Sequence, residues 1–168
     1  MEFSGKKVTV VGTGISGIGA VGLLNAVGAE VVLYDGNEKL KIEDIEKKLG
    51  TYKAEIVLGE LTKELTDSSD LLVISPGVPI DSPVVKAFEA AGVPVWGEVE
   101  LAYAFDKGKV LAITGTNGKT TTTALVGQIV GAYHKDTFVV GNIGNPYTTE
   151  VLKSNKDSYT VAEISSFQ

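Results

Sequence analysis

One segment of the sequence has the residue types that bind a nucleoside triphosphate. The stretch from Thr114 to Thr121 reads TGTNGKTT and follows an apolar, strand-like run. In such a loop the backbone N–H groups surround the phosphates, the Lys119 ammonium neutralises their oxygens, and the Thr120 hydroxyl ligates Mg²⁺. The usual form of the pattern begins with glycine, where this chain has Ile113. We therefore predict an ATP and Mg²⁺ site whose contacts are Gly115, Thr116, Asn117, Gly118, Lys119, Thr120 and Thr121.

A second glycine-rich segment lies near the N-terminus. Gly12, Gly14 and Gly17 form a G-x-G-x-x-G pattern between a predicted strand and a predicted helix, and Asp35 follows the next predicted strand. The glycines let the backbone approach a diphosphate, the helix N-terminus favours negative charge, and the carboxylate can accept a hydrogen bond from a sugar hydroxyl. The pattern favours a nucleotide ligand over a purely structural turn, but it leaves the kind of nucleotide open.

Two polar residues accompany the later strands. Glu163 lies near the end of a predicted strand at 159–164, and ligands of open α/β sheets gather at the carboxyl ends of strands. Its carboxylate could reach a Mg²⁺ ion near Lys119, or it could equally be a strand-end cap or a surface carboxylate. Asn142 could hydrogen-bond a substrate, although the composition of the segment 141–146 predicts a turn.

The elements that must position these residues alternate between strands and helices. A first set has predicted strands at 7–11, 30–34, 54–58, 71–75 and 93–96 and helices at 16–27, 38–49 and 83–91. A second set has strands at 110–114, 137–140 and 159–164 and a helix at 119–131. We predict an α/β fold with a Rossmann-like, parallel-sheet domain at 1–97, followed at 98–168 by the first part of a P-loop-type ATP-binding α/β domain. The second set is short for a whole doubly wound domain, so we expect truncation there.

Composition excludes several classes of function. The 168 residues contain no cysteine, which removes disulfides, thiolate metal sites and cysteine nucleophiles. Fifteen basic residues, all of them lysine, against 21 acidic residues give a net charge of −6, so we expect no nucleic-acid partner. The charged run at 38–48 is explained most simply as a solvated helix face. We find neither a signal peptide nor an apolar run of the roughly 20 residues that span a bilayer, and so predict a cytoplasmic protein without membrane association.

Four stretches of the chain, taken together, resemble the Mur ligase family. They are VVGTGISG at 10–17, ISPGVP at 74–79, ITGTNGKTTT at 113–122, and GNIG at 141–144 with EISSFQ at 163–168. The phosphate loop of that family is similar in lacking the earlier glycine, so the resemblance accounts for Ile113. It implies that the first domain holds the UDP part of a substrate, and that the substrate contacts are Gly14, Ile15, Ser16, Asp35, Ser75, Gly77, Asn142 and Ser165.

Within that family, the 74–79 and 163–168 segments are similar to those of the members that add D-glutamate. The resemblance implies a reaction in peptidoglycan-precursor synthesis, in which ATP phosphorylates UDP-N-acetylmuramoyl-L-alanine and the amine of D-glutamate attacks the acyl phosphate. It also implies that Lys119 and Glu163 are catalytic and that Thr120 and Glu163 ligate the metal. The enzymes of the family contain further parts, so we expect this chain, as a monomer, to bind substrate without completing the reaction.

Two other functions stay open on the residues alone. The first glycine pattern, with Asp35, would also suit a nicotinamide-dependent oxidoreductase, although the second phosphate loop has no role in such an enzyme. A non-catalytic nucleotide-binding or regulatory module would use both loops for sensing. Titrations with a UDP-sugar, NAD and ATP would separate these three functions.

Overall fold

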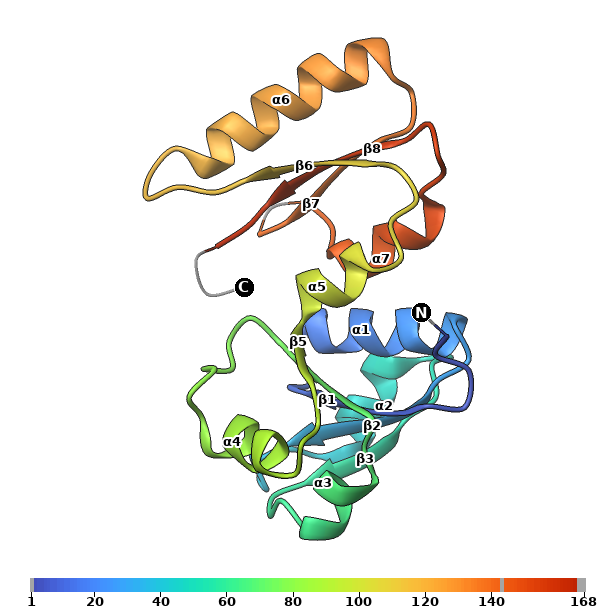
Figure 1. The fold of residues 1–168 in the computed structure, drawn as a ribbon, viewed down its shortest axis with the longest axis vertical. Coiled ribbons are helices and arrows are strands. Elements are labelled where there is room, and N and C mark those ends of the chain that lie inside the picture. Colours follow the sequence, from blue (N-terminus) through green and yellow to red (C-terminus); the bar gives the residue numbers. More distant parts are fainter. Residues whose placement is uncertain (1, 143, 166–168) are drawn as a thin grey trace. The chain divides into compact units, whose positions relative to one another are not determined.

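The computed structural model describes residues 2–142 and 144–165. The chain divides into two compact units, unit 1 at Met1–Glu98 and unit 2 at Val99–Gln168. Each unit has a sheet of parallel strands with helices packed against it, which confirms the predicted α/β class (Figure 1). None of the helices within the described ranges combines the length and the apolar character needed to cross a bilayer.

Unit 1 is built on a five-stranded sheet. Its strands, in spatial order, are β3 (Glu55–Leu58), β2 (Glu30–Asp35), β1 (Lys7–Val11), β4 (Leu71–Ile74) and β5 (Val95–Gly97), and every neighbouring pair is parallel. Strands covered on both faces are mostly apolar, and the central ones follow this rule: Val8, Val10, Leu33, Leu72 and Val73 are each 0% exposed. Thr9 of β1 is also 0% exposed, and its hydroxyl is hydrogen-bonded to the Ser69 hydroxyl at 2.8 Å.

Four helices connect these strands. They are α1 (Ile15–Ala26), α2 (Ile42–Leu49), α3 (Lys63–Ser68) and α4 (Pro83–Ala90). Figure 1 shows α1 on one face of the sheet and α3 and α4 on the other. A cluster of buried side chains joins α3 and α4 to the sheet, with Leu65 and Phe88 packed among strand residues such as Leu72. This is the arrangement expected of right-handed crossovers whose direction reverses at β1.

The reversal at β1 determines where a ligand can bind in unit 1. The chain passes from β1 to β2 on one side and arrives at β4 on the other, so that Val11 lies opposite Tyr34 in β2 and Ile74 in β4. In open α/β sheets the crevice outside the carboxyl ends of the strands at such a point is the usual ligand site. The segments that follow Val11, Asp35 and Ile74 all lie at this edge.

The second helix begins at Ile42, and the predicted start at residue 38 is wrong. Asp35 Oδ1 accepts from the Asn37 N–H at 3.1 Å, and Asn37 Oδ1 accepts from the Lys39 N–H at 3.1 Å. Such short side-chain bonds to the backbone offer an alternative to helical bonds and hold the segment as a turn. Helix α3 was not predicted because it is short; its start is fixed by Thr62, whose hydroxyl accepts from the Leu65 N–H at 3.3 Å.

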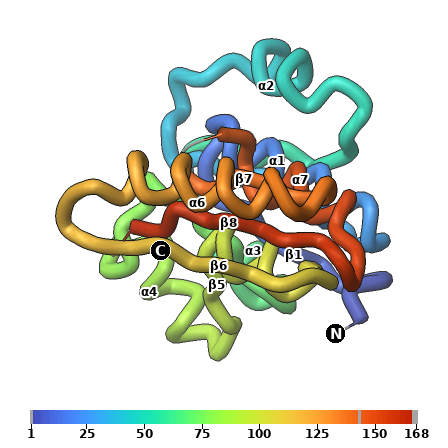
Figure 2. The backbone as a smooth tube through the Cα atoms, turned by 90° about the horizontal axis from the view of Figure 1, so that it is seen from above, coloured from blue at the N-terminus to red at the C-terminus, as the bar shows by residue number. Residues whose placement is uncertain are grey.

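Unit 2 contains a three-stranded parallel sheet. Its spatial order is β6 (Lys109–Ile113), β8 (Tyr159–Glu163) and β7 (Thr137–Gly141), so the last strand inserts between the first two. Helix α6 (Lys119–Tyr133) runs along one face of this sheet, over β7 and β8 (Figure 2). The remaining elements, none of them predicted from sequence, are α5 (Glu98–Tyr103), α7 (Tyr147–Glu150) and a 3-10 turn at Val151–Lys153.

A half-buried carboxylate connects the loop before β6 to the rest of unit 2. Asp106 Oδ2 accepts from the Tyr147 hydroxyl at 2.7 Å and from the Thr160 hydroxyl at 2.7 Å, while its Oδ1 accepts from the Gly108 N–H at 2.8 Å. Burial raises the pKa of Tyr147 above its ordinary value, as does the neighbouring Asp106, so this hydroxyl stays protonated and remains a donor. The network joins three segments that are far apart in the sequence.

Replacing Tyr147 by phenylalanine tests this network. Tyr147→Phe should lower the free energy of unfolding of unit 2 by about 2 kcal/mol, because a buried hydrogen bond to a charged acceptor is lost. Hydrogen–deuterium exchange of the β8 amides measures the change. Tyr133→Phe is the matched control, since Tyr133 is 83% exposed and its change should stay within about 0.5 kcal/mol. Equal protection of β8 in the two variants would contradict the prediction.

Candidate functional site

The loop after β1 is tied to the neighbouring strand β2. The Gly12 N–H donates to the Tyr34 carbonyl at 2.9 Å, extending the strand pairing by one residue, and the chain then turns with a Gly12 φ of +102°. Asp35 Oδ2 accepts from both the N–H and the hydroxyl of Thr13, at 3.2 and 3.0 Å. Thr13 donates to one oxygen of Asp35 and Asn37 donates to the other, so this carboxylate holds the glycine loop in position.

The fold requires two of the three glycines of this loop and places no steric limit on the third. A Cβ on Gly17 would overlap the Gly12 carbonyl oxygen, so α1 could not approach β1 with any larger residue there. A Cβ on Gly12 would lie 2.9 Å from Ser75 Oγ, in addition to the cost of its positive φ. A Cβ on Gly14 would meet nothing within 4 Å. The fold therefore explains Gly12 and Gly17, whereas Gly14 leaves open space in front of a helix N-terminus.

That helix N-terminus has the features of an anion site. Gly14 is the N-cap of α1, no side chain caps the helix, and its first turn contains no acidic residue. The first N–H groups of an α-helix have no partner within the helix and attract negative charge. Ser16 is half-buried there, while Ile15 is 79% exposed.

The segment after β4 lies against the same loop. The Ser75 N–H donates to the Val11 carbonyl at 3.2 Å, and a turn follows in which the Val78 N–H donates to the Ser75 carbonyl at 2.9 Å. Ser75 Oγ is buried beside Gly12 and Gly17 and has no hydrogen-bond partner in the described part of the chain. Gly77 is exposed and has open space around it. Ser75 and Gly77 thus lie next to the glycine loop at the carboxyl edge of the sheet.

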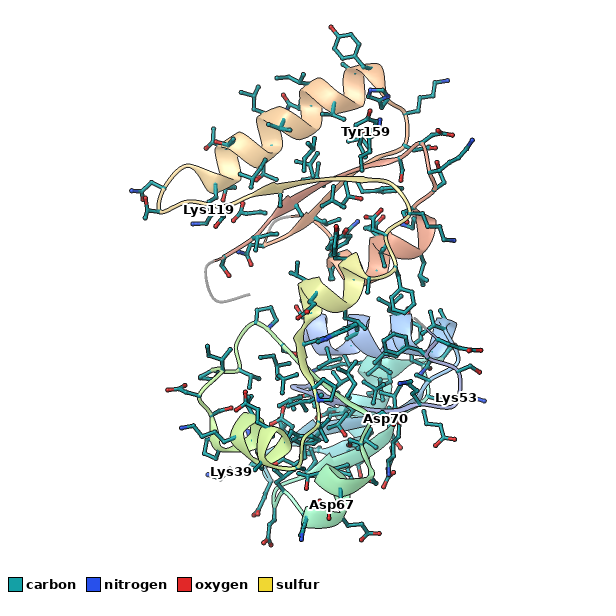
Figure 3. The ribbon with its side chains drawn as sticks, viewed as in Figure 1. Lys39, Lys53, Asp67, Asp70, Lys119 and Tyr159 are labelled. Atoms are coloured by element: carbon teal, nitrogen blue, oxygen red, sulfur yellow. The ribbon has the colours of Figure 1, made fainter. Side chains whose placement is uncertain are left out.

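The second glycine-rich loop connects β6 to α6. Gly115 and Gly118 have φ values of +152° and +74°, and Gly118 is the N-cap of a helix that no side chain caps and whose first turn lacks acidic residues. Lys119 stands at the start of α6, where its ammonium donates to the Gly115 carbonyl at 2.7 Å (Figure 3). Thr116, Asn117, Thr120 and Thr121 are exposed. The loop thus presents N–H groups and one cation to solvent, as a phosphate site requires.

Strand register brings the other polar residues of unit 2 to this edge. Ile113 of β6 and Gly141 of β7 both lie opposite Glu163 of β8. The Asn142 N–H donates to the Glu163 carbonyl at 3.2 Å, and a Cβ on Gly141 would collide with that same carbonyl. The phosphate loop, Asn142 and Glu163 therefore follow three adjacent strands at their carboxyl ends. Ser165 lies two residues further along the chain than Glu163.

Glu163 carries a buried carboxylate oxygen that could ligate a cation. It is 4% exposed, and its Oε2 is buried with no hydrogen-bond partner among the described residues. A buried carboxylate oxygen without a partner is costly unless a cation or donor completes it. Residues 2–142 and 144–165 contain no group of three or more acidic, histidine or cysteine side chains that could hold a metal by themselves. Mg²⁺ fits this donor set, because it commonly uses one or two protein oxygens together with phosphate oxygens and water.

The predicted contacts to the UDP substrate divide between the units. The first group lies at the carboxyl edge of the unit 1 sheet and comprises Gly14, Ile15, Ser16, Asp35, Ser75 and Gly77. Asn142 and Ser165 belong instead to unit 2, with the phosphate loop. Two motif segments extend beyond the described residues, since Ile143 and the end of EISSFQ, 166–168, lie outside them.

Sequence reasoning missed two residues at the unit 1 loop, one within it and one that contacts it from α2. Thr13 is a variable position of the glycine pattern, yet it is 6% exposed and bonded to Asp35. Lys48, near the end of α2, donates from its ammonium to the Thr13 carbonyl at 3.4 Å. The sequence pattern of the charged run at 38–48 could not predict this contact, because Lys48 and Thr13 are 35 positions apart.

Comparison with known families identifies the chain. The profile of the Mur ligase MurD-like N-terminal domain matches residues 6–97, which is more than half of the 168 residues. The chain belongs to the Mur ligase family. The profile of the Mur ligase middle domain also matches this Mur ligase, at residues 113–168. The resemblance drawn from the four sequence stretches is confirmed.

Relatives of this Mur ligase chain match it from end to end. The UDP-N-acetylmuramoylalanine--D-glutamate ligase of Lachnospira eligens is 69% identical over 168 residues, and the ligase of the same name from Lachnoclostridium phytofermentans is 57% identical over 169 residues. Each match covers 100% of this chain and 37% of the relative. The chain therefore spans little more than a third of the length of these relatives.

Solved structures share the fold of this Mur ligase chain. The UDP-N-acetylmuramate:L-alanyl-gamma-D-glutamyl-meso-diaminopimelate ligase from Neisseria meningitides has a TM-score of 0.56 at 20% identity, covering 95% of this chain and 52% of that one. A pseudomurein peptide ligase type C from Methanothermus fervidus has a TM-score of 0.52 at 25% identity, covering 96% and 33%. These likenesses support the α/β architecture and its Rossmann-like first part.

Substitutions at two glycines of the unit 1 loop should affect different properties, one the stability of the fold and the other ligand binding. Gly17→Ala should lower the free energy of unfolding by about 3 kcal/mol, because its Cβ overlaps the Gly12 carbonyl. Gly14→Ala should leave stability nearly unchanged and weaken UDP binding about tenfold, since its methyl group occupies space that only a ligand would use. Urea unfolding followed by the fluorescence of Trp96, together with UDP calorimetry, measures both effects. A Gly14→Ala variant that binds UDP as wild type does would remove Gly14 from the site.

Proposed function

We propose that the longer protein represented by this chain is an ATP-dependent, amide-forming ligase that adds D-glutamate to UDP-N-acetylmuramoyl-L-alanine, a step of peptidoglycan-precursor synthesis in the cytoplasm. The observation that carries the proposal is the carboxyl edge of the unit 2 sheet. The loop after β6 leads there to an uncapped helix N-terminus and Lys119, and the adjacent strand β8 ends at Glu163, whose buried Oε2 has no hydrogen-bond partner among the described residues. Family membership supports the same reaction, because the relatives described above are named for it.

In this proposal the two loops bind different ligands. Residues 1–97 hold the UDP part of the substrate, with the diphosphate at the N-terminus of α1 and the nucleoside beside the segments that follow β2 and β4. Residues 98–168 contribute the phosphate part of the ATP site, with Asn142 and Ser165 toward the muramoyl-alanine part. Uncapped first turns without acidic residues, present in both α1 and α6, support an anionic ligand at each.

The proposed chemistry transfers one phosphoryl group and then forms one amide. The substrate carboxylate attacks the γ-phosphorus of ATP, and ADP leaves. The amine of D-glutamate then attacks the acyl phosphate and releases inorganic phosphate. Lys119 exchanges its bond to the Gly115 carbonyl for the β- and γ-phosphate oxygens, where its charge stabilises the transferring group. Thr120 and Glu163 would hold Mg²⁺, which supplies further charge neutralisation at the phosphates.

Ligand preference tests the assignment of unit 1. The chain should bind UDP, or UDP-N-acetylmuramoyl-L-alanine, more tightly than NAD, because the glycine loop and the segment 75–77 occur here together in a Mur ligase chain whose relatives are named for a UDP-linked substrate. Calorimetric titration of the same sample with each ligand measures the affinities to be compared. Tighter binding of NAD would favour the oxidoreductase alternative.

The role of Lys119 can be tested in the full-length protein. Lys119→Ala should reduce kcat at least about a hundredfold, since loss of a charged contact to a transferring phosphoryl group costs about 3 kcal/mol of transition-state stabilisation. The sequence of this chain contains no arginine that could substitute for it. Affinity for the UDP substrate and thermal stability should barely change. Lys135→Ala, an exposed lysine beyond the end of α6, is the control, and near-normal turnover of Lys119→Ala would exclude the role.

A further inference from the structure

We propose that Lys48 binds the diphosphate of the nucleotide held by the glycine loop of unit 1. This inference rests on the proposed UDP site and assigns to it a cation that the glycine pattern does not contain. Lys48 belongs to α2, whereas the loop follows β1, so the pairing is created by the fold alone.

The contact that carries the inference is between the Lys48 ammonium and the Thr13 carbonyl. Its length is 3.4 Å, at the long end for a hydrogen bond, and the lysine is otherwise exposed. An ammonium has three donors, so the remaining ones are available to a ligand. Among lysines of the described ranges, Lys48 is the one whose ammonium bonds to this loop. Its neighbour Lys47 is directed elsewhere, to Asp44 at 3.4 Å.

A diphosphate bound at the loop would leave an excess of negative charge there, which a cation would offset. A nucleoside diphosphate brings at least two negative charges to the N-terminus of α1, where the carboxylate of Asp35 already lies within 3.2 Å of the Thr13 nitrogen. A helix N-terminus is equivalent to about half a positive charge, which does not offset these anions. Nucleotide sites commonly add a basic side chain, and this chain has lysine but no arginine. Lys48, next to Thr13, is in place to supply it.

If Lys48 had a purely structural role, its loss would have a different effect on ligand binding. If the ammonium served only to hold the Thr13 carbonyl or to offset Asp35, its loss would disturb the loop for any ligand. A diphosphate contact affects ligands in proportion to their phosphate charge. Comparing UDP with uridine, which shares the base and sugar but has no phosphate, therefore separates the two roles.

The experiment measures the affinities of UDP and uridine by NMR titration of the 168-residue chain and its variants. Lys48→Gln should weaken UDP binding about fivefold and change uridine binding by less than about twofold. Lys48→Arg should retain UDP affinity, because it preserves the charge. Lys47→Gln is the matched control, one position away on the same helix, and should bind both ligands as wild type does.

Each outcome either supports or overturns the inference. Equal UDP affinities of wild type and Lys48→Gln, or an equal loss for uridine and UDP, would overturn it while leaving the UDP site of unit 1 intact. An equal loss in Lys47→Gln would show a general effect of surface charge and would also overturn it. Failure of the wild-type chain to bind UDP at all would reject the proposed UDP site, and the role of Lys48 with it.

Discussion

The parallel direction of every strand pair is the constraint on which the rest of the structure depends. In a parallel sheet all carboxyl ends lie at one edge, so the segments that follow different strands meet there whatever their separation in the sequence. In unit 1 this edge collects the glycine loop, Asp35 and Ser75. In unit 2 it collects the phosphate loop, Asn142 and Glu163. Each candidate site is thus a consequence of strand direction before it is a consequence of any particular side chain.

Close approach of backbone to backbone is the second condition for these sites. Gly17 allows α1 to begin directly beside the turn at Gly12, and Gly141 allows β7 to end against the Glu163 carbonyl. In both places a single methyl group would separate the elements. In unit 1 this close approach places the N-terminus of α1 at the edge of the sheet. Helix N-termini bind anions through N–H groups that the fold already holds in position, so little entropy is lost on binding.

The two units obtain positive charge in different ways. Unit 2 carries its lysine within the phosphate loop, and Lys119 rests on the Gly115 carbonyl of that same loop. In unit 1 the glycine pattern has no basic residue, and Lys48 reaches it from another helix. Because this chain has no arginine, a phosphate bound at either loop would meet single ammonium groups, which cannot make the bidentate contact of a guanidinium. Much of the geometric selection in each loop is therefore left to the backbone N–H groups.

The sequence by itself determined the α/β class, most strand positions, and both glycine-rich loops, because apolar runs, helical periodicity and glycine placement are local properties. The sequence also identified the family, since the loop at 114–121 and the segments around it are contiguous motifs. It could not give the order β6-β8-β7, which brings Glu163 beside the phosphate loop, because strand order depends on pairing between distant segments. The start of α2 at Ile42 and the contact of Lys48 with Thr13 were likewise decided by tertiary structure. Side-chain hydrogen bonds, and packing across many residues, outweigh local propensity at such positions.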